Sequence, residues 1–281
     1  MKKTLILGGT MFLGPALINR LLSNGDEYDI TCFHRGLHGK RDERVSHILG
    51  DRRDEQAVKQ LFSQWYDLVI DLSGTEETMI ESAIMYARGN CGRYVFVSSS
   101  SVYSPEYENP HREDEELHAG TGNAYAAAKI RGEQFLALTH EHYTVIRPSK
   151  IYGLGNYYFS ENEFLERIRK NPTIVLNHDP ILHFTWIEDF VSGLTALAEK
   201  DGIFNVAGFE PARLSRFIQI IGAIHDLKPE FVFEKPSDVP FTDLSDRILD
   251  LSRAEKTAGW TPAVPLEQGL RVTFGLTDSA R

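Results

Sequence analysis

Short apolar runs alternate with stretches of helical periodicity throughout the first 150 residues, and this alternation restricts the fold more than any other feature of the sequence. Several runs are apolar at nearly every position, as in strands that are buried on both faces of a parallel sheet. The pattern predicts strands over residues 4–7, 30–33, 45–49, 68–72, 94–97 and 143–146, with helices from residue 13 and over residues 76–88 and 124–139. This order predicts an α/β fold with a doubly wound parallel sheet and helices on both faces.

The pattern loosens after Arg147-Pro148, where scattered Gly, Asn, Pro and aromatic residues replace the regular alternation. Residues 188–200 and 213–227 keep helical spacing, and residues 203–206 between them are typical of a strand that returns to the first sheet. We therefore predict a larger domain over residues 1–150, with that returning strand, and a smaller C-terminal substrate-binding domain over residues 151–281.

A glycine-rich turn, Gly8-Gly9-Thr10-Met11-Phe12-Leu13-Gly14, joins the first predicted strand to the first predicted helix. Glycine permits a tight turn and the close approach of a pyrophosphate, and the free N–H groups of a helix N-terminus face its negative charge. The turn thus predicts a Rossmann-type NAD(P)-binding domain. The predicted cofactor contacts of the turn are Gly8, Thr10, Met11, Phe12, Leu13 and Gly14. The alternative is a glycine turn that only packs a helix onto a strand.

The second predicted strand ends in His34-Arg35, without the carboxylate that usually holds the ribose of NAD. Residues 34–53 carry six Lys and Arg against three acids, in a chain whose formal charge is -10. This basic segment suits the 2′-phosphate of NADP, so we expect NADP to be preferred over NAD. Its predicted cofactor contacts are His34, Arg35, Asp51 and Arg52, with Asp51 at the adenine edge. A solvated basic loop is the alternative.

Tyr125 and Lys129 lie four residues apart in a predicted helix, so their side chains share one face. A nearby ammonium favours the phenolate form of a tyrosine, whose ordinary pKa is about 10. A run of serines, residues 98–101, directly follows the fifth predicted strand. A hydroxyl at the carboxyl end of a central strand lies where α/β sheets bind ligands and can donate a hydrogen bond to a carbonyl oxygen.

Together these motifs resemble those of the short-chain dehydrogenase/reductase superfamily, and most closely its extended, NAD-dependent epimerase/dehydratase branch. The motifs are the glycine turn, Val97-Ser98-Ser99-x-x-Val102-Tyr103, Tyr125-x-x-x-Lys129, Arg147-Pro148-x-x-Ile151-Tyr152-Gly153 and Ala258-Gly259-Trp260-Thr261-Pro262. The resemblance implies that Ser99 polarises a substrate oxygen, Tyr125 exchanges its proton, and Lys129 lowers the tyrosine pKa and holds the nicotinamide ribose. It further implies an NAD(P)-dependent oxidoreductase or epimerase that transfers hydride to or from a sugar or nucleotide-sugar.

Four departures from the branch bear on the reaction. Met11 replaces a glycine of the family turn, as in a subgroup that includes chloroplast stem-loop RNA-binding proteins, so a non-catalytic cofactor-sensing or RNA-binding protein stays as the alternative. Ser100 and Ser101 stand where dehydratases of the branch have Asp-Glu, which argues against dehydration. Lys150 replaces a common asparagine, and an arginine frequent in nucleotide-sugar enzymes is missing. Lys150 and Arg247 are candidates for a substrate diphosphate, or solvated and structural residues.

Composition limits the partners. Acidic residues outnumber basic ones 40 to 30, so the surface as a whole should repel nucleic acid and anionic membranes. Two cysteines form no disulfide framework, no CxxC or HExxH spacing predicts a metal site, and no apolar run reaches the roughly 18 residues of a membrane span. We expect a cytoplasmic protein with a small-molecule substrate and no membrane or nucleic-acid partner; a homodimer is left open.

Overall fold

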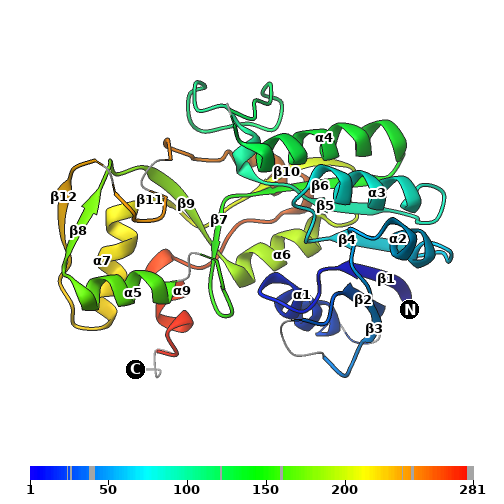
Figure 1. Ribbon diagram of the computed structural model, residues 1–281, viewed down its shortest axis with the longest axis horizontal. Coiled ribbons are helices and arrows are strands. Elements are labelled where there is room, and N and C mark those ends of the chain that lie inside the picture. The colour runs from blue at the N-terminus through cyan, green and yellow to red at the C-terminus, as the bar shows by residue number, and fades with distance from the viewer. Residues whose placement is uncertain are drawn as a thin grey trace.

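A large seven-stranded sheet flanked by helices joins a smaller unit built around two short sheets (Figure 1). The computed structural model describes residues 1–23, 25, 27–37, 42–120, 122–158, 161–235, 237–241 and 244–276. Within these residues, no helix is both long and apolar enough to cross a membrane.

Every neighbouring pair of strands in the large sheet is parallel. The spatial order is β10-β6-β5-β4-β1-β2-β3. The strands are β1 (Lys2–Leu7), β2 (Tyr28–His34), β3 (Ser46–Leu49), β4 (Leu68–Asp71), β5 (Tyr94–Val97), β6 (Tyr143–Pro148) and β10 (Gly202–Val206). Strand order reverses between β1 and β4, and ligands of such sheets bind at this switch point. The predicted doubly wound, Rossmann-type α/β fold is confirmed.

Helices cover both faces of this sheet because successive side chains of a buried strand point to opposite faces. In β1, Ile6 packs into the core beneath α1 (Leu13–Leu22) and α6 (Ile187–Leu197). Its neighbours Leu5 and Leu7 pack into the other core. That second core lies beneath α2 (Glu55–Leu61), α3 (Glu77–Ala87) and α4 (Ala124–Thr139).

The smaller unit lies at the left of Figure 1 and has its own apolar core. Its three-stranded sheet has the order β11-β9-β7, and a second pair joins β12 to β8. The strands are β7 (Lys150–Tyr152), β8 (Thr173–Leu176), β9 (Ile181–Trp186), β11 (Pro211–Arg213) and β12 (Glu230–Phe233), and the helices are α5 (Glu161–Lys170), α7 (Leu214–Ile224) and α9 (Leu266–Thr273).

The chain returns to the large sheet after the smaller unit has begun. Helix α6 and strand β10 both pack there, and α8 (Ser252–Ala258) brings Ala254 into the same core. Trp260 is buried against α6, where its Nε1 donates a 2.9 Å hydrogen bond to Ser192 Oγ. The smaller unit therefore starts near residue 150, but the large unit also takes later segments of the chain.

Candidate active site

The glycine turn between β1 and α1 is wound too tightly for side chains at two positions. Gly8 has φ 98°, a backbone conformation that favours glycine, and a Cβ there would lie 2.6 Å from Cβ of Ser73. A Cβ on Gly14 would lie 2.3 Å from the carbonyl carbon of Gly9. The turn is therefore pressed against the chain that follows β4, at the switch point of the sheet.

Met11 does not disrupt this turn. Its φ is not in the left-handed region, whereas the next residue, Phe12, has φ 43°. Helix α1 starts without a side-chain cap; in its first turn the Gly14 N–H donates to the Met11 carbonyl at 3.0 Å and Pro15 has no N–H, which leaves the N–H of Leu13 for a ligand. The glycine that the family has at position 11 is thus not required by the backbone of this chain.

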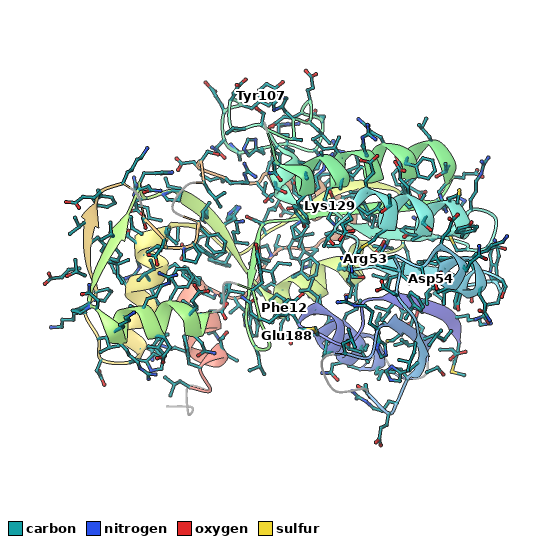
Figure 2. The ribbon with its side chains drawn as sticks, viewed as in Figure 1. Phe12, Arg53, Asp54, Tyr107, Lys129 and Glu188 are labelled. Carbon is teal, nitrogen blue, oxygen red and sulfur yellow. The ribbon has the colours of Figure 1, made fainter. Side chains whose placement is uncertain are left out.

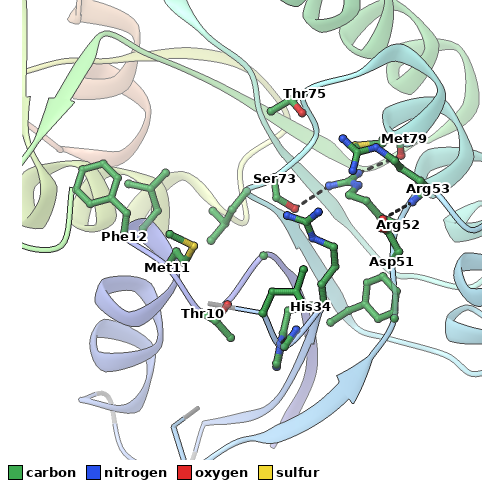
Figure 3. Close-up of a pocket in the computed structure, with 18 of the residues that line it drawn as sticks. Thr10, Met11, Phe12, His34, Asp51, Arg52, Arg53, Ser73, Thr75 and Met79 are labelled. Carbon is green, nitrogen blue, oxygen red and sulfur yellow. Dashed lines mark hydrogen bonds between the residues drawn. The ribbon is translucent and has the colours of Figure 1, made fainter. Parts of the chain in front are cut away.

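A cleft of about 350 Å³ runs along the carboxyl ends of β1 to β4 (Figure 3). Nine of the predicted cofactor residues line it: Gly8, Thr10, Met11, Phe12, Leu13, His34, Arg35, Asp51 and Arg52. Gly14 is not in the lining. The lining residues not predicted from the sequence include Leu37, Arg53, Ser73, Thr75, Met79 and Tyr157. Ser73 and Thr75 directly follow β4, so applying the strand-end rule to that strand would have found them.

The cleft fits a dinucleotide in its chemistry. Its glycine turn and open helix N-terminus suit a pyrophosphate, and its size lies in the range of small-molecule sites. Arg35 is exposed at the rim and has no hydrogen bond or ion pair to any residue that the structure describes. Arg53 is paired with Glu76 at 2.5 Å. The Arg35 guanidinium is therefore unpaired among the described residues, at the end of the cleft where we predict the adenosine. Lys40 and Arg41, which we counted in the basic segment, lie outside the described residues.

Arg52 belongs to the wall of the cleft. Its guanidinium makes two hydrogen bonds to the buried carboxylate of Asp71, at 2.7 and 2.8 Å. It also donates to Ser73 Oγ at 2.9 Å and to the carbonyl of Met79 at 3.0 Å (Figure 3). These bonds tie the chain after β3 to the chain after β4, so Arg52 shapes the cleft with most of its donors already used.

His34 shapes the loop that carries Arg35. Its Nδ1 accepts a 3.0 Å hydrogen bond from the backbone N–H of Gly36, and its Nε2 lies 2.9 Å from Nδ1 of His47 on β3. The buried ring therefore holds the backbone after β2 against the neighbouring strand. This is a positioning contact at the end of the cleft where we predict the adenosine ribose.

Ser99 and Tyr125 meet beside the sheet edge. Ser99 follows β5 and caps a short 3-10 helix over residues 100–102, where its Oγ accepts hydrogen bonds from Ser101 N at 3.1 Å and Ser101 Oγ at 2.8 Å. Tyr125 stands in the first turn of α4, is 41% exposed, and lies close enough to Ser99 for the serine hydroxyl to oppose the rise of the tyrosine pKa. A hydroxyl pair open to solvent is thus formed by residues far apart in sequence.

Lys129 lies one turn further along α4, near the junction of the two units (Figure 2). It is 2% exposed, its Nζ donates a 2.6 Å hydrogen bond to the carbonyl of Val97, and Nζ lies 5.5 Å from the centroid of the Tyr125 ring. Burial lowers the pKa of Lys129 to about 8, although the Asp71 carboxylate acts in the opposite direction. The structure therefore brings the three predicted catalytic residues together.

The electrostatics of Tyr125 differ from the prediction. We expected Lys129 to lower the tyrosine pKa. Burial instead raises the pKa of Tyr125, and the opposing influence is the hydrogen bond with Ser99. The reason is geometric, since the Lys129 ammonium faces the tyrosine ring and the Val97 carbonyl rather than the phenol oxygen.

A buried ion pair holds the end of β5 behind these residues. Ser98 Oγ donates a hydrogen bond to the carboxylate of Glu133 on α4. Arg147 of β6 bonds both oxygens of that carboxylate, with the shortest distance 2.6 Å. Its Nη1 also donates to the hydroxyl of Tyr103 at 3.0 Å. Ser98, which we interpreted as structural, thus anchors the strand that presents Ser99.

Lys150 and Arg247 lie together near the serine turn. Arg247 Nη1 donates a 3.0 Å hydrogen bond to the carbonyl of Ser100. Lys150 Nζ lies 4.6 Å from the ring centroid of Phe241. Burial lowers the pKa of Lys150 to about 8, and the charge of Arg247 adds to this effect. The two predicted substrate residues are therefore close to each other and to the catalytic serine.

Residues 4–207 match the model of the NAD dependent epimerase/dehydratase family. The chain belongs to this family. The match spans the glycine turn, the serine strand and the tyrosine helix, and it confirms the predicted epimerase/dehydratase branch and an enzyme of this NAD-dependent class.

Two relatives and one solved structure illustrate how similar this chain is to other proteins. A chloroplast stem-loop binding protein of 41 kDa from Arabidopsis thaliana is 27% identical over 98% of this chain and 79% of its own length. A UDP-glucuronate 4-epimerase from Thermodesulfobacterium geofontis is 25% identical over 96% of this chain and 94% of its own length. A UDP-glucose 4-epimerase from Thermotoga maritima, solved with UDP-glucose, shares the fold with a TM-score of 0.84 at 21% identity, covering 98% of both chains.

Proposed function

We propose that this family member is an NADP(H)-dependent oxidoreductase or epimerase that acts on a sugar or nucleotide-sugar by hydride transfer, without dehydration. One arrangement carries the proposal: Ser99 and Tyr125 lie close together, and Lys129 lies one turn beyond Tyr125 on the same helix. The carbonyl and hydroxyl chemistry of a sugar needs such a donor pair beside a cofactor cleft.

The cofactor would lie along the cleft, with its pyrophosphate at the glycine turn and its adenosine toward Arg35 and Asp51. Bound there, it accepts or supplies the hydride. The direct contacts that we assign to Gly8, Thr10, His34 and Arg52 stay predictions. Gly14 acts through the tight packing of the turn rather than through the lining.

The residues of the chain would move the proton and hold the substrate oxygen. Ser99 would donate a hydrogen bond to that oxygen, and Tyr125 would give the oxygen a proton in reduction or take one in oxidation. Lys129 would hold the nicotinamide ribose, and its buried ammonium lies one helical turn from Tyr125, 5.5 Å from the centroid of the tyrosine ring.

The absence of dehydration follows from the residues after Ser99. Water loss needs an acid and a base near the leaving hydroxyl. Here Ser101 donates its own hydroxyl to Ser99, and Ser100 is buried. Neither hydroxyl replaces a carboxyl pair, because both are far less acidic than a carboxylic acid.

The substrate class is supported by the relatives and by two cations. The names of two relatives, a UDP-glucuronate 4-epimerase and a dTDP-4-dehydro-6-deoxyglucose reductase, describe nucleotide-sugar reactions. Lys150 and Arg247, beside the serine turn, would bind an anionic part of such a substrate.

The deciding experiment is to incubate the protein with hexose nucleotides and NADP(H) and to follow the products by mass spectrometry. A gain of two mass units indicates reduction, and an isobaric product with a new retention time indicates epimerisation. A loss of 18 mass units contradicts the proposal. A Tyr125→Phe sample is the matched control for contaminating activity.

A non-catalytic RNA-binding protein is the second candidate, because the stem-loop binding protein of Arabidopsis thaliana matches nearly the whole chain. The formal charge of -10 opposes it, since phosphate contacts dominate nucleic-acid affinity. An electrophoretic mobility assay with a stem-loop RNA separates the two: RNA binding at physiological salt combined with no turnover on any nucleotide-sugar favours this candidate.

A further inference from the structure

Two cationic side chains lie side by side along one edge of β9. Lys150, the first residue of β7, is paired with Phe184 of β9. Arg247 forms an isolated parallel bridge with Leu182, two positions earlier on β9. The opposite edge of β9 at residues 181–183 is taken by β11, so both cations lie on the β7 edge. Two residues along a strand span roughly 7 Å, which places them within reach of one small anion.

Neither cation has a carboxylate partner among the described residues. Lys150 makes no hydrogen bond or ion pair with any described residue and stacks only on Phe241. Arg247 uses one nitrogen on the Ser100 carbonyl, and its Nε is buried without a partner.

Two buried arginines elsewhere in the described chain, Arg52 and Arg147, are each paired with a buried carboxylate, whereas Lys150 and Arg247 are partly buried. An uncompensated buried charge is costly, and two neighbouring ones cost more because they also repel. Burial accordingly lowers the pKa of Lys150 and of Arg247. An anionic ligand bound between the two side chains would supply the negative charge that the described residues do not.

The pair also lies close to the reacting groups. Arg247 donates a hydrogen bond to the carbonyl of Ser100, the residue after Ser99, and Ser99 lies close to Tyr125. For a sugar that reacts at C4, a carboxyl group on C5 is attached one carbon away from the reacting carbon. The diphosphate of a nucleotide-sugar is attached to C1, on the opposite side of the ring from C4.

We propose that Lys150 and Arg247 form a subsite for a carboxylate on the reacting sugar, so that the substrate is an acidic sugar. This inference rests on the proposed hydride-transfer function and names its substrate class. The alternative source of the same anionic oxygens is the diphosphate of the nucleotide, and the experiment below separates the two.

The test is calorimetric titration of the full chain, loaded with NADP⁺, with UDP-glucuronic acid, UDP-glucose and UDP. The wild type should bind UDP-glucuronic acid at least about tenfold more tightly than UDP-glucose, the effect expected of a charge-assisted contact. Lys150→Met keeps the apolar stem and should remove this preference, whereas Lys150→Arg should retain most of it. Lys228→Met removes an exposed cation of the same unit as the matched control and should change nothing.

Two outcomes overturn the subsite. If Lys150→Met weakens UDP, UDP-glucose and UDP-glucuronic acid equally, the pair binds the diphosphate. If the wild type has no preference for the acid form, the pair binds no carboxylate. Free D-glucuronate against D-glucose, followed by saturation-transfer NMR, repeats the comparison without the nucleotide, and absence of glucuronate binding in both formats also overturns it.

The same samples distinguish failure of the subsite from failure of the proposed function. NADPH fluorescence is measured for each variant, and retained binding shows that Lys150→Met is folded. A wild type that binds NADPH and reduces or epimerises a neutral sugar, but has no carboxylate preference, contradicts the subsite alone. A wild type that binds no nicotinamide cofactor contradicts the proposed function.

Discussion

At the scale of single residues, the site depends on a few side chains whose surroundings differ sharply. Tyr125 is half exposed and lies close to Ser99, whereas Lys129 is almost completely buried. Arg35 stands at the rim of the cleft without a partner among the described residues, whereas Arg53 nearby is paired. These differences support the proposal that proton transfer, ribose binding and cofactor selection belong to different residues.

Tyr125→Phe should lower turnover by at least about 10²-fold and leave cofactor affinity near that of the wild type, because only the proton donor is deleted. Steady-state kinetics and NADPH fluorescence measure the two effects. Lys129→Ala should damage both quantities. Tyr107→Phe, which changes an exposed tyrosine of a surface loop, is the control. Wild-type turnover by Tyr125→Phe would contradict the mechanism.

Arg35→Ala should weaken NADPH binding by about tenfold or more and leave NADH binding within twofold, since the lost guanidinium would face only the 2′-phosphate. Fluorescence titration with both cofactors gives the ratio. Arg44→Ala is the matched control, because Arg44 belongs to the same basic segment but is paired with Asp42. An unchanged NADPH to NADH ratio in Arg35→Ala means that Arg35 does not select the cofactor.

Lys150→Met should be more stable than the wild type at pH 7. The pKa of Lys150 is about 8 in the folded chain against 10.5 ordinarily, so the unfolded chain binds more protons between these values. The free energy of unfolding of the wild type therefore rises with pH through that window. The difference in stability between the wild type and Lys150→Met shrinks as pH rises from 8 to 10. Urea unfolding of both proteins between pH 7 and 10 measures the difference. A variant less stable than the wild type at pH 7 would show that the lysine is compensated in the folded chain.

At the scale of elements, the predicted strands of the large sheet and helix α4 agree with the structure to within a few residues. The prediction gave no element to the chain over residues 153–185 and after residue 228. Strands β8 and β12 have four residues each, as β4 and β5 do, but unlike those two strands they are only partly buried, and α8 has only seven residues. They are stabilised by pairing with distant segments.

The buried pair of Glu133 and Arg147 joins α4 to β6 behind the catalytic serine. Glu133→Gln should destabilise the protein by about 3–5 kcal/mol, because Arg147 stays buried without its carboxylate. Glu163→Gln is the control: Glu163 forms a partly exposed ion pair with Arg167, and its loss should cost under about 1 kcal/mol. Urea unfolding measures both. Equal effects of the two substitutions would show that the buried pair has no special role.

At the scale of the whole molecule, the chain passes five times between the two units, and Trp260 is fixed on the large unit just before the last passage, which leads to α9. Its ring packs so closely on α6 that a Cβ on Gly193 would lie 2.8 Å from it. Trp260→Ala should therefore cost about 3–5 kcal/mol, whereas Trp260→Phe should cost less because it keeps most of the packing. Urea unfolding compares the two variants, and an equal loss in both would assign the effect to the hydrogen bond with Ser192.

The parallel α/β sheet, the glycine turn and the four-residue spacing of Tyr125 and Lys129 could be predicted from the sequence. These features depend on local periodicity and on residues a few positions apart, so they are legible without coordinates. Which charges are paired depends on the folded chain, because their partners come from distant segments. Arg52 and Arg147 lie against buried carboxylates, whereas Lys150 and Arg247 have no carboxylate partner among the residues that the structure describes. Burial, which no spacing encodes, likewise decided the direction of the pKa of Tyr125.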